Sequence, residues 1–261
     1  MSTTLSHVVT MLGGGQAVTG FFLVLARITP LFIVAPLFSS TMIPGAVKGV
    51  IAVAFAIGLT GIAMHGQHIP GDPIPVAGLI AVNLLVGLLL AFVIAGMFAA
   101  VQMAGGLADI VSGFSFGATI DPINGNQGGT FTELYGLVGV MLFIAIGGDA
   151  WILQGLTRTF ALVPLTKAPQ LGPMVSGAET ATSSMFVAAI EVAAPAILAL
   201  LITDVAFGLV SKVVPQLNVF AVAFPLKVGV ALLVVSASLP FLGGWMSNQM
   251  YTSVATALHA L

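Results

Sequence analysis

One serine lies in a spacing that is typical of hydrolytic enzymes. Gly113, Ser115 and Gly117 match the G-x-S-x-G pattern, in which a serine on a tight strand-to-helix turn attacks a carbonyl carbon. That chemistry needs an acid and then a histidine further along the chain, and the only later histidine is His259, next to the C-terminal end. We therefore expect the match to be accidental. An intramembrane serine hydrolase that uses Ser115 remains the alternative from a different functional class.

The aspartates and histidines are the other candidates for chemistry. Asp149 and Asp204 are the residue type of an aspartyl protease dyad, but Ile146 stands where a G-x-G-D signature has its first glycine. They are expected instead to pair with Arg158 or Lys212, or to lie at helix termini. No two histidines have the i, i+4 spacing of a zinc protease, and cysteine is absent. The sequence therefore predicts no metal, no cofactor and no enzymatic activity.

The composition indicates a membrane protein. Charged residues make up 5% of the chain and hydrophobic residues 59%, whereas a soluble domain carries roughly 25% charged residues. The mean hydropathy is +1.17, so the chain cannot cover a surface that faces water. With a net charge of -2 and isolated Lys and Arg residues, it has no basic face for nucleic acid. No removable signal peptide is expected, because a basic region before a short apolar core is missing.

Long apolar segments predict an all-α fold in a single subunit that covers residues 1–261. The six segments are 17–38, 47–64, 76–101, 134–156, 185–210 and 219–242. Most of them contain or touch a charge, and three are interrupted by proline. This pattern is typical of broken helices that are buried in protein, because charge and free backbone groups are costly in lipid.

Four charges inside these segments are expected to be buried against protein and paired: Arg27, Glu191, Asp204 and Lys227. An arginine near the centre of an isolated membrane helix costs about 3 kcal/mol on insertion scales. Arg27 should therefore face protein, water or a carboxylate. Two interpretations of it stay open, a structural ion pair and a role at a channel wall.

The loop charges do not select an orientation in the membrane. If all six segments span, Lys48 and Lys212 lie on one side, and Arg158 and Lys167 on the other. We therefore expect insertion to depend on partner subunits.

A central stretch, residues 105–129, is too polar and glycine-rich to continue the apolar segments. Phe114, Phe116 and Ile120 supply bulk at alternating positions, as an extended loop presents it, and the surrounding glycines free the backbone. We expect this stretch to form a flexible apolar stopper. An ordinary connection between helices is the alternative.

Several motifs resemble the FliR family, which forms part of the flagellar type III protein-export gate. Residues 215–220 read PQLNVF and residues 224–227 read FPLK, which is similar to that family's signature. The likeness extends to RITPLF from Arg27, to IP ahead of Lys48, and to GFSFG at 113–117. Lys212 departs from the family, which more often has arginine there, so the charge is kept but the bidentate fork is lost. The motif residues with an expected role in partner docking are Pro30, Pro36, Pro44, Pro215, Gln216, Asn218, Phe220 and Pro225.

The resemblance implies a non-enzymatic export-gate subunit without a cofactor. Its helices would pack as hairpins in a conical assembly with the companion subunits FliP and FliQ, contacted by the FlhB switch protein, membrane lipid and unfolded export substrates. The gate would lie in the bacterial inner membrane, in the flagellar basal body, raised toward the periplasmic side. The loop is similar to the family's plug, so Gly113 to Gly117 and Ile120 would close the pore and move aside for substrate. The equivalent subunit of a virulence type III secretion system is the alternative.

Overall fold

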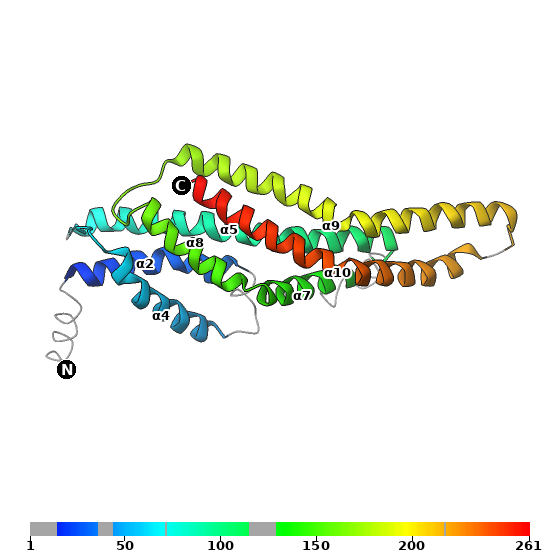
Figure 1. Cartoon of the computed structure of the whole chain (residues 1–261), viewed down its shortest axis with the longest axis horizontal. Coiled ribbons are helices and arrows are strands. Elements are labelled where there is room, and N and C mark those ends of the chain that lie inside the picture. Colours follow the sequence, from blue (N-terminus) through cyan, green and yellow to red (C-terminus); the bar gives the residue numbers. More distant parts are fainter. Residues whose placement is uncertain (1–14, 36–43, 71, 115–128, 217) are drawn as a thin grey trace. The chain divides into compact units, whose positions relative to one another are not determined.

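Every regular element in the described part of the chain is an α-helix (Figure 1). The computed structural model describes residues 15–35, 44–70, 72–114, 129–216 and 218–261. The helices are α2 (Gly15–Val34), α4 (Gly45–Ala63), α5 (Pro73–Ser112), α7 (Thr130–Ala145), α8 (Gly148–Leu162), α9 (Leu171–Val213) and α10 (Val219–His259). The predicted all-α class is therefore confirmed for these residues.

Three helices are much longer than predicted. Helices α5, α9 and α10 have 40, 43 and 41 residues, and at about 1.5 Å per residue each is roughly twice as long as the ~30 Å hydrocarbon core of a bilayer. The predicted bounds 76–101, 185–210 and 219–242 are too short. Hydropathy marks where a helix is apolar, whereas the backbone hydrogen bonds continue through polar turns such as SGAET at 176–180.

Two predictions about the middle of the chain are wrong. Residues 105–112, assigned to the central stopper, continue α5. The segment predicted as one helix over 134–156 is two helices, α7 and α8, separated by a break at Ile146 and Gly147. Gly147 has a φ of 69°, a left-handed conformation that glycine adopts without steric strain after a helix end. Polar and glycine residues at 105–112 lie within a helix here, and the break at Gly147 depends on its left-handed backbone conformation, so the apolar pattern alone did not reveal either feature.

The chain divides into two compact units. Unit 1 comprises Met1–Gly96, Gly148–Thr182 and Met250–Leu261, and unit 2 comprises Met97–Gly147 and Ser183–Gln249. Helices α5, α9 and α10 contribute residues to both units. The unit boundaries lie inside these helices, after Gly96, Thr182 and Gln249.

In unit 1, α2 packs against α4 as a hairpin, and the first part of α5 and α8 complete the core (Figure 1). The core is made of aliphatic side chains, among them Leu23 and Ile28 of α2, Leu90 of α5 and Leu156 of α8. A Cβ on Gly87 would overlap the backbone carbonyl of Arg27, so α2 and α5 cross with backbone contact. Small residues allow this kind of approach between membrane helices.

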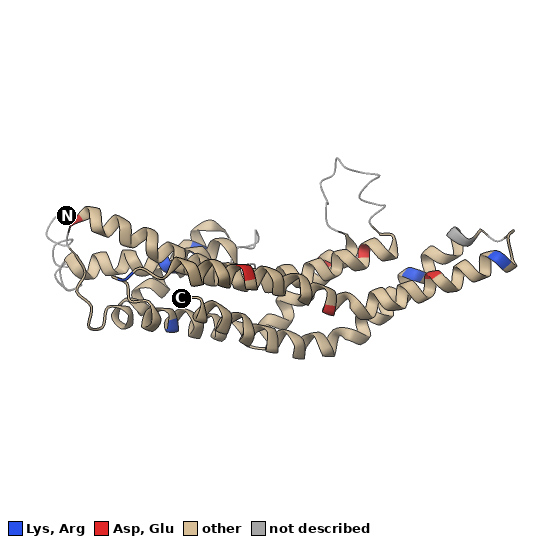
Figure 2. Cartoon of the chain, turned by 90° about the horizontal axis from the view of Figure 1, so that it is seen from above, with Lys and Arg blue, Asp and Glu red and all other residues tan. Residues whose placement is uncertain are grey.

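In unit 2, α9 and α10 run side by side as a second hairpin (Figures 1 and 2). The ring of Phe98 in α5 packs 5.1 Å from that of Phe143 in α7, measured between centroids. Ala100 packs with Ala188 and Ala189 of α9. The hairpin packing that the resemblance implies is thus present in both units.

The helices have the length and composition of membrane spans. Five of those in the described ranges qualify, and the pair α7 and α8 adds a sixth if it counts as one broken span. Charged residues are sparse along them (Figure 2). Large apolar side chains such as Ile33, Ile57 and Leu233 are exposed on the isolated chain, so lipid or other proteins must cover these faces.

Candidate functional site

A buried carboxylate, Asp109, holds the base of the central loop. It lies near the end of α5 and is 2% exposed. Its oxygens accept hydrogen bonds from the backbone N–H groups of Phe131 (2.9 Å) and Thr132 (2.8 Å) and from the Thr132 hydroxyl (2.7 Å). These donors belong to the first turn of α7, where N–H groups lack partners within the helix and negative charge is favoured. Asp109 therefore caps α7 from α5 and ties together the two helix ends that flank the loop.

Two glycines make this junction possible. A Cβ on Gly129 would overlap the Asp109 carboxylate, and a Cβ on Gly105 would lie 2.7 Å from the Thr132 Cα atom. Gly129 precedes α7 and offers no side-chain cap of its own, so Asp109 supplies the cap from a neighbouring helix. Any side chain at either glycine would force α5 and α7 apart.

Two of the predicted plug residues, Gly113 and Phe114, belong to the described part of the chain and lie at this junction. Gly113 ends α5 with a φ of 90°, which favours glycine. Phe114 packs edge to face against Phe131 of α7 at 5.4 Å and Phe224 of α10 at 5.9 Å, measured between ring centroids. The remaining candidate plug residues, Ser115, Phe116, Gly117 and Ile120, lie outside the described residues.

A second polar cluster surrounds Arg27 in unit 1, where its side chain is fully buried. Its Nε and Nη2 atoms donate to the Asn83 Oδ1 atom at 2.9 and 2.6 Å. Its Nη1 atom donates to the backbone carbonyl oxygens of Thr159 (3.0 Å) and Val163 (2.8 Å). The guanidinium lies 4.7 Å from the centroid of the Phe160 ring. One side chain of α2 thereby holds α5 and the end of α8.

No carboxylate forms an ion pair with Arg27 among the residues that the structure describes. Instead its charge lies at the C-terminal end of α8, where the carbonyl groups and the helix dipole favour a cation. Asn83 also donates to the carbonyl oxygen of Leu165 at 3.0 Å, which fixes the segment after α8. This geometry supports a structural role for Arg27 in which carbonyl and amide oxygens replace the expected carboxylate.

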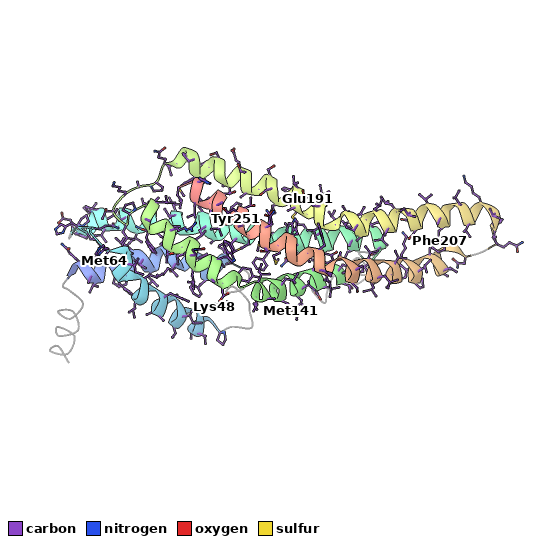
Figure 3. The ribbon with its side chains drawn as sticks, in the orientation of Figure 1. Lys48, Met64, Met141, Glu191, Phe207 and Tyr251 are labelled. Atoms are coloured by element: carbon purple, nitrogen blue, oxygen red, sulfur yellow. The ribbon has the colours of Figure 1, made fainter. Side chains whose placement is uncertain are left out.

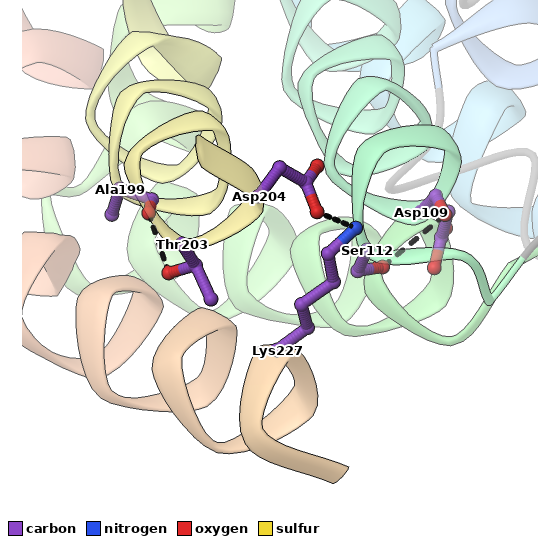
Figure 4. Close-up of polar contacts among 6 residues, drawn as sticks. All are labelled: Asp109, Ser112, Ala199, Thr203, Asp204 and Lys227. Atoms are coloured by element: carbon purple, nitrogen blue, oxygen red, sulfur yellow. Dashed lines mark hydrogen bonds and ion pairs between the residues drawn. The ribbon is translucent and has the colours of Figure 1, made fainter. Parts of the chain in front are cut away.

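Asp204 of α9 and Lys227 of α10 form an ion pair between the two arms of the hairpin (Figure 4). Their side chains are 43% and 18% exposed. Glu191 lies on the exposed surface of α9 (Figure 3) and accepts a 3.4 Å hydrogen bond from the Trp245 indole. Burial of Glu191 against protein therefore stays a prediction about an assembly of several chains.

The motif residues occupy helix interiors, helix starts and one turn. Pro30 is buried inside α2, Pro44 directly precedes α4, and Pro225 lies within α10. Pro215 and Gln216 form an exposed turn after α9. The remaining three are Asn218, whose Oδ1 atom accepts the Ala221 N–H at 3.2 Å, Phe220 in the first turn of α10, and Pro36, which lies outside the described residues.

The arrangement of the other titratable groups gives no assembled catalytic site in the described ranges. Asp149 is exposed in the first turn of α8, and Asp204 is engaged with Lys227. Within the same ranges, no three His, Asp or Glu side chains come together in a way that could hold a metal ion.

Three residues that organise these clusters were missed from the sequence: Asp109, Asn83 and Thr159. Asn83 had a usable signal, because it is a lone amide in an otherwise apolar segment and such groups need a partner in a membrane. The sequence signal for Asp109 was weaker, because an acid in a glycine-rich stretch is equally typical of a solvated loop. The sequence held no signal for Thr159, since Arg27 donates to its backbone carbonyl oxygen, which every residue has.

Comparison with known proteins agrees with the motifs. The family described as "Bacterial export proteins, family 1" matches residues 18–253. The flagellar biosynthetic protein FliR of Escherichia coli (strain K12) is 28% identical over 229 residues, 85% of each chain. FliR of Bacillus subtilis is 31% identical over 85% of this chain and 87% of its own. The surface presentation of antigens protein SpaR of Salmonella typhimurium is 26% identical over 80% and 78%.

The matched range contains the Arg27 cluster, the Asp109 junction and the α9–α10 hairpin with its ion pair. The chain therefore belongs to family 1 of the bacterial export proteins and is a homologue of FliR.

Proposed function

We propose that residues 1–261 form one non-enzymatic subunit of the flagellar type III protein-export gate. The observation that carries this proposal is the family match over residues 18–253, together with FliR relatives that align over 85% of the chain. The FliR relatives align over 219–231 residues and the SpaR relatives over 211 residues, and the longer FliR alignments favour the flagellar system over its virulence counterpart.

The surface of the chain supports a role inside a larger assembly. Long α9 and α10 expose rows of large apolar side chains, including Leu201, Val205 and Leu209 on α9 and Leu233 and Phe241 on α10. Both helices are longer than a bilayer is thick. Companion subunits of the FliP and FliQ type, with FlhB in contact, would cover these faces in the inner membrane of the basal body. Helices of this length would also allow the gate to rise toward the periplasm.

The central loop is the proposed seal of the channel. Its base is pinned by Asp109, and Phe114 is packed between α7 and α10 within unit 2. Phe114, Phe116 and Ile120 would fill a narrow opening, and an apolar constriction excludes water and ions. Burial of one phenylalanine contributes about 1.5–3 kcal/mol, which keeps a pore closed most of the time and lets an engaged unfolded substrate displace the seal.

Two measurements on the complex, purified with companions encoded beside this chain, test the proposal. Co-purification tests membership of the export gate, and conductance tests the seal. Exchange of Phe114 and Phe116 for alanine, or deletion of residues 113–117, should raise the conductance of an intact complex in a planar bilayer. The matched control is Phe22→Ala, which removes an exposed aromatic ring from α2. Conductance equal to that of the parent complex would reject the seal. Failure of the chain to co-purify with any export subunit would reject the gate.

The hydrolase alternative has its own test in Ser115. Because we treat the G-x-S-x-G match as accidental, Ser115→Ala should leave export and assembly intact. Loss of export together with loss of labelling by a fluorophosphonate probe would instead establish a serine nucleophile.

A further inference from the structure

Unit 1 contains a groove between α8 and the last turns of α10, with a volume of about 390 Å³. At one end the rings of Trp151 and Tyr251 pack edge to face, with 6.0 Å between centroids. One turn further on, a Cβ on Gly155 would lie 3.1 Å from the Val254 Cγ1 atom. The two helices therefore run in the same direction from the aromatic pair, and in Figure 1 the red end of α10 lies beside α8. Figure 3 labels Tyr251 at this position.

Small side chains are the reason for the hollow. Gly155 and Ala255 line the groove along its middle, and Ala161 lines it near the end of α8. The apolar wall is completed by Val254 and Leu258. A volume of this size lies within the ~300–1,000 Å³ that ligand pockets occupy.

The far end of the groove carries a guanidinium and an imidazole. Arg158 lies two helical turns beyond Trp151, His259 lies two turns beyond Tyr251, and both side chains line the groove and are exposed. In the ranges that the structure describes, neither side chain has an acidic partner. The order along the groove is thus an aromatic pair, an apolar trough and an unpaired guanidinium.

We propose that this groove binds one anionic phospholipid, with an acyl chain in the trough and the phosphate at Arg158. A guanidinium presents paired N–H donors that match phosphate oxygens. The apolar trough with the rings of Trp151 and Tyr251 at its opposite end would surround the acyl chain. The site is separate from the central loop and from the proposed export role, and it would tie the end of unit 1 to a lipid surface.

Native mass spectrometry tests whether the groove selects an anionic lipid. The complex is purified with its companion subunits and titrated with phosphatidylglycerol or phosphatidylcholine. The parent complex should retain phosphatidylglycerol in preference to phosphatidylcholine. Arg158→Gln should lower retention of phosphatidylglycerol about fivefold, since one basic residue at an anionic lipid surface contributes ~1 kcal/mol. The matched control is Lys167→Gln, which removes an exposed charge after α8 that does not line the groove. Equal retention in the Arg158 and Lys167 variants would overturn the proposal.

Two further measurements do not depend on Arg158. Ala255→Leu fills the trough and should lower the retention of both lipids. A photo-crosslinking residue at Gln154, on the rim of the groove in an otherwise unchanged chain, should label phospholipid. Crosslinking of Gln154 to another polypeptide in place of lipid would show that a protein covers the groove and would overturn the lipid site.

Discussion

Replacing Asp109 with alanine should loosen the base of the central loop while leaving α5 and α7 helical. The change removes the acceptor for three hydrogen bonds of 2.7–2.9 Å. The N–H groups of Phe131 and Thr132 then lose their partner at the start of α7. The hydroxyl of Thr132 can rotate toward other acceptors, but the two amide groups cannot, and Phe131 is fully buried.

The expected cost is about 2–4 kcal/mol of folding free energy. Each buried amide left without an acceptor costs ~1–3 kcal/mol, and loss of a whole N-cap costs ~0.5–2 kcal/mol in other proteins. These two figures describe overlapping effects, so they are not added. Asp109→Asn should cost about half as much, because one amide oxygen remains as acceptor while the NH₂ group faces the second backbone N–H. The stability order is therefore Asp, then Asn, then Ala.

Thermal and denaturant unfolding of the purified complex measure this order, and bilayer conductance measures the loop. The matched control is Asp149→Ala, which removes an exposed acid from the first turn of α8 and should cost at most ~1 kcal/mol. The Asp109→Ala complex should also conduct more, since the two helix ends that flank the plug are no longer tied together. If Asp109→Ala and Asp149→Ala unfold alike and both complexes stay closed, the carboxylate does not organise the loop.

Three other perturbations follow from the same contacts. Arg27→Met should lower the unfolding free energy by several kcal/mol, since Asn83 and two carbonyl groups lose their donors at ~1–3 kcal/mol each. The control is Lys167→Met, which removes an exposed charge, and equal unfolding of the two variants would argue against the cluster. The Asp204–Lys227 pair is partly exposed on the isolated chain. If companion subunits bury it, Asp204→Ala and Lys227→Ala should each lower the yield of assembled gate more than the double variant, because one unpaired buried charge costs ~3–5 kcal/mol. Normal yields from all three variants would mean that water solvates the pair in the gate, where such a pair contributes ~1 kcal/mol or less. The chain expressed alone should aggregate or be degraded, because its apolar helix faces stay uncovered, and companion subunits should rescue it; a stable, monodisperse chain in detergent would contradict this.

The sequence by itself determined the fold class and the family. Apolar segments of 18–26 residues with few charges can satisfy their backbone in a membrane only as helices, and every regular element of the described ranges is a helix. The PQLNVF and FPLK motifs led to the FliR family, which the match over residues 18–253 confirms. Both conclusions depend on local composition or short runs of residues, which can be recognised without knowledge of the tertiary contacts.

Only the tertiary structure decided how the polar residues are used. Arg27 meets Thr159 across 132 positions of sequence, and Asp109 caps a helix that begins after the central loop. The pairing of Asp204 with Lys227, in place of the expected Arg158 or Lys212, likewise depends on the register of two long helices in a hairpin. Such contacts follow from helix packing, because partners are chosen by proximity and by the need to satisfy each buried polar group. Hydropathy describes whether a residue favours an apolar environment or water, and it contains no information about which residues are its neighbours in space.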